Sequence, residues 1–190
     1  EAIQAFGLSP EKKTILILGG SLGARTINNT LIAGLQTIKE TNGIQFIWQT
    51  GKIYYQQVME AVKTAGEIPN LYVTDFIKDM ATAYSAADLV ISRAGAGSIS
   101  EFCLLSKPVI LVPSPNVAED HQTKNALALV NKQAAIYVKD VEAEEKLLSV
   151  ALETITNATK LKDLSENIAK LALPDSATTI AKEVIKLAQQ

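Results

Sequence analysis

The stretch SRAGAGSISEFCLLSKPVILVPSP, residues 92–115, decides the fold of this chain. An apolar run at 87–91 precedes it, a loop of small residues opens it, and a second apolar run at 108–112 lies near its end. Between the loop and the second run, apolar residues recur at helical spacing. The pattern predicts a strand, a tight loop, a helix and another strand.

The start of this predicted helix has the residues of an anion site. Ser98 and Ser100 lie near the expected helix start, and Glu101 is expected within the first turn. Backbone N–H groups there have no acceptor inside the helix, and the helix dipole favours negative charge. We therefore expect the loop to hold an anionic ligand, with the Glu101 carboxylate beside a portion that carries hydroxyl groups.

A second glycine-rich turn, GGSLGA, occupies residues 19–24 after the predicted strand at 14–18. Apolar residues at helical spacing from Ile27 to Ile38 predict one helix after it. Glycine lets a backbone approach a phosphate closely, and a helix start supplies N–H donors. The spacing is neither G-x-G-x-x-G nor a P-loop, so an ordinary strand-to-helix turn is an equal interpretation of these residues alone.

The whole chain alternates strand and helix patterns, which predicts an α/β fold with a Rossmann-like open parallel sheet and helices on both faces. The predicted strands are 14–18, 44–49, 71–73, 87–92, 108–112 and 135–138. In such folds ligands bind outside the carboxyl ends of the strands, where both glycine-rich loops are expected. A helical extension is predicted over about 141–190, its third helix carrying Ile180, Val184 and Leu187.

Composition limits the classes of function. The 190 residues fit one domain, and 47% hydrophobic with 20% charged residues is typical of a soluble globular protein. A net charge of −2 gives no global reason to expect nucleic-acid binding. No apolar run approaches the roughly 20 residues needed to cross a bilayer. The single cysteine, Cys103, is predicted to be a buried, inert thiol.

Four motifs, in this order, carry a resemblance: LGGSLGA (18–24), VTDFIKDM (73–80), SRAGAGSISE (92–101) and EDHQTKNA (119–126). They resemble the carboxyl-terminal domain of the MurG family of bacterial glycosyltransferases, over nearly the whole chain. The resemblance implies one half of a GT-B architecture, in which two Rossmann-like domains face each other across a cleft. It also implies binding of UDP-N-acetylglucosamine, for inverting transfer of N-acetylglucosamine to lipid I, which forms lipid II in peptidoglycan synthesis.

The resemblance assigns two loops to the diphosphate of the donor, each bringing backbone groups from a helix start. The matching positions are Gly20, Ser21, Gly23, Ala96, Gly97 and Ser98. Gly97 stands where a larger apolar residue is common in the family, which predicts looser packing near the phosphate. No D-x-D motif and no His/Cys cluster with metal-ligand spacing occurs in the sequence. We therefore expect donor binding without metal or cofactor.

The resemblance assigns the nucleoside and the sugar to further positions. Ile77 would lie against uracil, and Arg93 would lie in the uridine pocket. Glu101 would accept hydrogen bonds from the ribose hydroxyls, and Gln122 and Asn125 would contact hydroxyls of the sugar. All five residues lie in the predicted loops or in the helix starts that follow them.

Part of the family's machinery has no counterpart in these motifs. The catalytic base, the lipid I site and the membrane-facing patch belong to an amino-terminal domain. A chain that begins at Glu1 is expected to be a fragment that binds the donor with little or no turnover. The implied location is the cytoplasmic face of the bacterial inner membrane, reached through that other domain. His121, where some relatives carry Gln, is predicted to lie on the helix surface or contact the sugar rather than act as a base.

Three other interpretations stay open at this point. A UDP-N-acetylglucosamine 2-epimerase would need further catalytic carboxylates and histidines, and the chain has one histidine. A non-catalytic UDP-sugar-binding subunit of a two-chain transferase becomes the leading interpretation if the chain is naturally complete. A dinucleotide-binding domain would need an acidic residue at a strand end about 20 residues after the first glycine loop, whereas Glu40 precedes the second predicted strand.

Overall fold

One parallel sheet of six strands organises the protein, and its strand order is β3-β2-β1-β4-β5-β6. The structure, a computed structural model, describes residues 2–115, 120–174 and 185–186. The strands are β1 (Lys13–Leu18), β2 (Ile44–Gln49), β3 (Leu71–Thr74), β4 (Leu89–Ser92), β5 (Val109–Leu111) and β6 (Ile136–Tyr137). The predicted open parallel sheet is confirmed, and each predicted strand overlaps an observed one.

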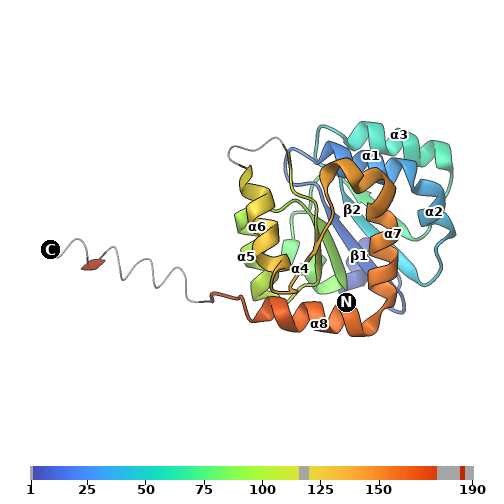
Figure 1. Ribbon diagram of the computed structural model, residues 1–190. Helices are drawn as coiled ribbons and strands as arrows, with labels where there is room; N and C mark the ends of the chain where they lie inside the picture. Colours follow the sequence, from blue (N-terminus) through green and yellow to red (C-terminus); the bar gives the residue numbers. More distant parts are fainter. Residues whose placement is uncertain (1, 116–119, 175–184, 187–190) are drawn as a thin grey trace.

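Helices cover both faces of this sheet (Figure 1). One face packs on α1 (Arg25–Ala33), α2 (Leu35–Glu40), α3 (Tyr55–Ala65) and α7 (Ala143–Thr156). The other packs on a 3-10 helix η1 (Ala2–Phe6), α4 (Met80–Ala86), α5 (Ala96–Leu104), α6 (His121–Val130) and α8 (Ala158–Ala169). Because both faces are covered, β1 is a nearly continuous apolar run whose alternate residues enter opposite cores.

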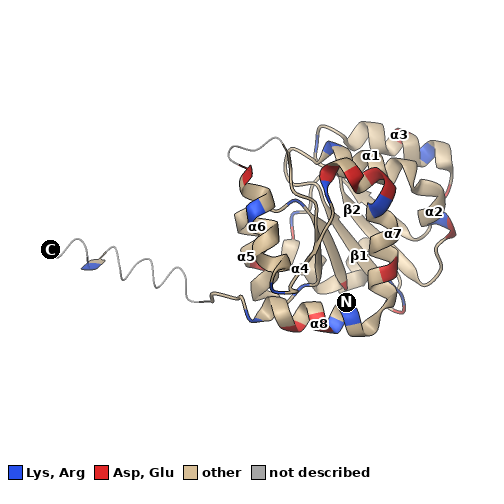
Figure 2. Ribbon diagram, in the orientation of Figure 1, with Lys and Arg blue, Asp and Glu red and all other residues tan. Residues whose placement is uncertain are grey.

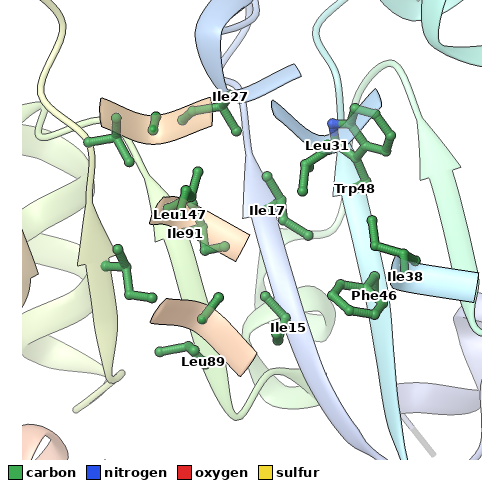
Figure 3. Close-up of a cluster of buried hydrophobic side chains, with 14 of the residues drawn as sticks. Ile15, Ile17, Ile27, Leu31, Ile38, Phe46, Trp48, Leu89, Ile91 and Leu147 are labelled. Atoms are coloured by element: carbon green, nitrogen blue, oxygen red, sulfur yellow. The ribbon is translucent and has the colours of Figure 1, made fainter. Parts of the chain in front are cut away.

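Helix α7, within the predicted helical extension, packs into the first core. Figure 3 shows Leu147 of α7 among the side chains of β1 and β4, beside Ile17 and Ile91. Leu147, Ala151 and Ile155 are fully buried there. Helix α7 is therefore part of the cover of the sheet. The three residues named for the predicted third terminal helix, Ile180, Val184 and Leu187, lie outside the described residues.

The single helix predicted after the first glycine loop is wrong, since the chain breaks at Gly34 into α1 and α2. A Cβ atom at Gly34 would lie 2.5 Å from Leu148 Cδ2 of α7, so the glycine lets α7 approach closely. The apolar spacing runs on through the break, which is why the pattern predicts one helix. The 3-10 helix η1 was likewise not predicted.

A buried polar link joins α1 to the end of β2. Trp48 Nε1 donates to Asn28 Oδ1 over 2.9 Å, and Asn28 Nδ2 donates to the Thr50 carbonyl over 2.9 Å. All three residues are almost fully buried. The link fixes the start of α1 relative to the strand end beside which it lies.

Asn28→Ala is expected to lower the free energy of unfolding by about 2–4 kcal/mol, because it leaves a buried indole N–H and a buried carbonyl without partners. Urea denaturation of the chain measures the change. Asn131→Ala, at an exposed position after α6, is the control, with an expected loss below about 0.5 kcal/mol. Equal losses in the two variants would contradict a stabilising role for the link.

Candidate functional site

The carboxyl ends of the strands meet at one edge of the sheet. Leu18 at the end of β1 pairs with Gln49 and with Ser92, and Ser92 pairs with Leu111. After β1 the chain enters α1 on one face, whereas after β4 it enters α5 on the other face (Figure 1). Such a switch point leaves a crevice between the diverging loops.

A cavity of about 270 Å³ lies at this switch point, and we call it the crevice cavity. It brings together seven of the predicted site residues, namely Gly20, Ser21, Ile77, Arg93, Ser98, Glu101 and Gln122. Gln49, Phe76, Met80 and Tyr84 line it as well, without having been predicted as site residues. A polar neighbouring cavity contains Gly23 and is also lined by Arg93 and Gln122.

The loop after β1 is held in place by Gln49. The backbone N–H of Gly20 donates to Gln49 Oε1 over 3.0 Å, and Gln49 Nε2 donates to the carbonyls of Gly20 and Asp75 at 2.9 and 3.0 Å. The side chain of Gln49 is buried. It therefore connects two loops of the crevice, those after β1 and β3.

Gly23 packs the same loop against the loop after β2. Its φ is +80°, and a Cβ atom there would lie 2.6 Å from the Thr50 carbonyl oxygen and 2.5 Å from Tyr54 Cδ2. Only glycine meets both conditions without strain. The structure thus gives Gly23 a packing role, while its contact with a diphosphate stays a prediction.

Two helix starts flank the crevice without side-chain caps. Gly95 precedes α5 and Ala24 precedes α1, and neither supplies a capping hydrogen bond. Asp79, by contrast, caps α4 by accepting from the Thr82 N–H. Ser98 lines the crevice cavity from the first turn of α5. The first-turn N–H groups of α1 and α5 are thus available to an anion.

Ala96 and Gly97 lie in the same first turn and are exposed, outside the lining of the crevice cavity. A Cβ atom at Gly97 would meet nothing within 4 Å. The space beside this exposed glycine is open, and looser packing near a phosphate stays a prediction.

Glu101 is the sixth residue of α5, so its predicted place in the first turn is wrong. The helix begins at Ala96, within the small-residue loop, which moves Glu101 into the second turn. Its Oε2 atom accepts a hydrogen bond of 2.7 Å from the Tyr84 hydroxyl. Burial, and then this bond, raise the pKa of Tyr84, so the phenol is a protonated donor at neutral pH.

Arg93 lines both cavities, and its guanidinium holds several segments at this edge of the sheet together. It donates to the carbonyls of Val112 and Pro113 at 3.0 and 3.2 Å and forms an ion pair with Asp140. Asp140 also accepts from the Thr26 hydroxyl over 2.8 Å. The guanidinium thus joins the end of β5 to the short 3-10 helix η3 (Asp140–Glu142). Its place beside a uridine stays a prediction.

Helix α6 contributes two amide side chains. Gln122 Oε1 accepts from the N–H groups of Ala94 and Ser114, at 3.2 and 2.8 Å. Asn125 Nδ2 donates to the Ala94 carbonyl over 3.1 Å, outside the lining of the crevice cavity. His121 is exposed at the first position of α6.

The remaining predictions concern metals, thiols and charge. Within 2–115, 120–174 and 185–186, no group of three or more His, Cys, Asp or Glu is placed to hold a metal ion, and no helix is long and apolar enough to cross a membrane. Cys103 is buried as predicted, and burial raises the pKa of its thiol. Figure 2 shows Lys and Arg distributed among several helices rather than gathered on one.

Comparison with known proteins gives a consistent assignment. The model of the glycosyltransferase family 28 C-terminal domain matches residues 14–180. The chain is 86% identical over 190 residues to the UDP-N-acetylglucosamine--N-acetylmuramyl-(pentapeptide) pyrophosphoryl-undecaprenol N-acetylglucosamine transferase of Bacteroides fragilis. It is 79% identical over 188 residues to the enzyme of the same description from Bacteroides thetaiotaomicron. The alignments cover 100% and 99% of this chain but 50% of each relative, so the chain spans about half their length.

Solved structures share the fold. The crystal structure of Acinetobacter baumannii MurG has a TM-score of 0.80 at 29% identity, over 97% of this chain and 53% of that one. The UDP-GlcNAc 2-epimerase of Neisseria meningitidis, bound to UDP-GlcNAc, has a TM-score of 0.68 at 14% identity, over 97% of this chain and 47% of that one. The second likeness is one of fold alone.

Proposed function

The chain belongs to the glycosyltransferase family 28 C-terminal domains, and from this membership we propose that it is the UDP-N-acetylglucosamine-binding half of the enzyme that adds N-acetylglucosamine to lipid I to form lipid II. The observation that carries the proposal is the crevice cavity, which is lined by Gly20 and Ser21 of the loop before α1, by Ser98 in the uncapped first turn of α5 and by Glu101. The N–H groups at a helix start suit an anion, and a carboxylate suits a pair of neighbouring hydroxyls. A nucleoside diphosphate carries a diphosphate anion and a ribose diol.

Each part of the donor has a matching part of the cavity. The diphosphate fits Ser21, Ser98 and the N–H groups at the start of α5 in the crevice cavity, with the start of α1 in the neighbouring cavity. The ribose fits Glu101, and uracil fits the apolar wall made by Phe76 and the buried Ile77. The sugar then extends toward Gln122, which lines both cavities.

The chemistry of transfer suits these groups. Cleavage of the bond between the sugar and UDP develops an oxocarbenium-like centre, and negative charge builds on the departing diphosphate. Fixed N–H dipoles at two helix starts stabilise that charge without rearranging. Because the proposal gives the diphosphate these N–H donors and two serine hydroxyls, we expect no requirement for a divalent metal in donor binding.

The edge that carries the cavity also suits a second domain. Large apolar side chains are exposed in the segments after β1, β2 and β6, with exposed fractions of 73% for Leu22, 69% for Ile53 and 86% for Val141, which lies in η3. Curated relatives have about twice the length of this chain. We propose that the other half of the polypeptide covers this edge and supplies the base, the lipid I site and the contact with the cytoplasmic face of the membrane. The chain alone then binds the donor with little turnover.

The rival interpretations have less support. The epimerase shares the fold at 14% identity, which carries no argument about activity. The relatives described as transferases are single polypeptides of about twice this length, which favours a two-domain enzyme over a two-chain one.

Calorimetric titration of the chain tests the proposal. UDP-N-acetylglucosamine and UDP are expected to bind, and UMP to bind at least about tenfold more weakly, because it lacks one phosphate and its charge-assisted hydrogen bonds. NAD is not expected to bind, and EDTA is expected to leave the affinity for UDP unchanged. Tight binding of NAD, or no binding of any uridine nucleotide by folded protein, would overturn the proposal.

A further inference from the structure

Tyr84 brings a buried hydroxyl to the crevice cavity from α4, which packs on the same face of the sheet as α5. The residue is 5% exposed, and its ring meets Phe102 edge-on, with ring centroids 6.0 Å apart. Its hydroxyl lies 2.7 Å from Glu101 Oε2. Ring packing alone would be served equally well by phenylalanine, so the hydroxyl is the part of this side chain that packing does not explain.

The hydroxyl restricts Glu101, whose residue is otherwise exposed on α5. A free glutamate side chain loses conformational entropy when a ligand fixes it. Tyr84 fixes it beforehand, by holding one carboxylate oxygen. Among the described residues no other hydrogen bond to the Glu101 side chain is found, so the second oxygen keeps its lone pairs for a ligand.

We propose that Tyr84 is a positioning residue that presents the free carboxylate oxygen of Glu101 to the ribose diol and so makes the site selective for ribonucleotides over 2′-deoxyribonucleotides. The inference rests on the proposed function, since it assumes a uridine nucleotide in the crevice cavity. A site built to bond two hydroxyls rejects a ligand that lacks one, because a fixed acceptor is then left unpaired. A carboxylate free to turn would adapt and discriminate less.

The test compares UDP with 2′-deoxy-UDP by calorimetry on the wild-type chain and on Tyr84→Phe. The substitution keeps the ring and its contact with Phe102. The affinity for UDP is expected to fall about fivefold, the net worth of one hydrogen bond. The affinity for 2′-deoxy-UDP is expected to fall less, so that the ratio between the two ligands shrinks at least about twofold.

Two further variants separate positioning from folding. Tyr72→Phe, in β3, keeps an edge-on contact with Phe6 away from the crevice cavity and is expected to leave both affinities unchanged. In a Glu101→Ala background, Tyr84→Phe is expected to have no further effect on either ligand, because its partner is gone.

The outcomes distinguish the two proposals. If the wild-type chain binds UDP but Tyr84→Phe has the same affinity and the same ratio, the positioning role is wrong and the donor site stands. The positioning role would also be wrong if Tyr84→Phe lowered the affinity for both ligands equally, or lowered it further in the Glu101→Ala background. The Tyr84 hydroxyl would then affect binding by stabilising the fold rather than by holding Glu101. If the folded wild-type chain binds neither ligand, the donor site itself is wrong.

Discussion

Glu101→Gln is expected to weaken UDP binding by about tenfold or more, because two hydroxyls of the ribose lose a charged acceptor. The amide keeps the size of the side chain and can still accept from the Tyr84 hydroxyl, which bonds Oε2 over 2.7 Å in the wild-type chain. Only the charge and part of the acceptor capacity are removed. Calorimetry with UDP measures the loss, and thermal unfolding is expected to stay within a few degrees of wild type, since Glu101 is exposed.

Glu166→Gln is the matched control for this charge change. Glu166 lies on α8, at the opposite end of the strands from the crevice (Figure 1), and pairs only loosely with Lys162, at 3.7 Å. Its substitution is expected to leave UDP affinity unchanged. If Glu101→Gln also bound UDP with wild-type affinity, Glu101 would not face the ribose, and the ribose would have to lie elsewhere in the cavity.

The architecture was predictable because the strands are buried on both faces. Strand β2 reads IQFIWQ, and its bounds agree with the prediction, since glycine-containing turns lie on either side of it. The two loops of the site were predictable for a similar reason: each is a run of small residues directly after an apolar strand. Placing them together needed only the rule that parallel strands end at one edge.

The missed parts of the site depend on contacts between residues far apart in the chain. Gln49 is simply the polar last residue of a strand in the sequence, and its hydrogen bonds to Gly20 and Asp75 follow only from the register of three strands. Tyr84 meets Glu101 because α4 and α5 pack on the same face. The alternation of strands and helices predicts that both helices exist, but it does not predict which side chains touch.

The position of Arg93 in the site was predicted, but its contacts with the rest of the protein were not. A cationic side chain in a ligand loop suggests contact with an anion, and the resemblance placed it beside uridine. The structure gives the guanidinium three protein partners, the carbonyls of Val112 and Pro113 and the carboxylate of Asp140. The ion pair with Asp140 joins β4 to the segment after β6, across the end of β5. Its value to the site is therefore in fixing the shape of the loops around both cavities.

Gly51→Ala is expected to disrupt both the stability of the chain and its binding of UDP. Gly51 has φ +78°, where alanine costs about 1–2 kcal/mol. Its Cβ would also lie 2.3 Å from Gly23 N and 2.4 Å from Gly23 Cα, and these are backbone atoms that cannot turn away. We expect the free energy of unfolding to fall by at least about 3 kcal/mol, and UDP affinity to fall by more than about tenfold, because the loop after β1 must move.

Gly43→Ala is the control that separates the two effects of Gly51→Ala, the overlap of the new Cβ atom with the Gly23 backbone and the cost of a positive φ. Gly43 has φ +74°, but a Cβ atom there would meet nothing within 4 Å, and it precedes β2 at the edge of the sheet opposite the crevice. Its substitution is expected to cost only about 1–2 kcal/mol of strain and to leave UDP affinity unchanged. The difference between the two variants in urea denaturation and in calorimetry then measures the contact between the loops. If Gly51→Ala lost no more stability or UDP affinity than Gly43→Ala, the close packing of Gly51 on Gly23 would not shape the diphosphate site. The glycines after β1 would then matter only because they let the backbone come close to the ligand.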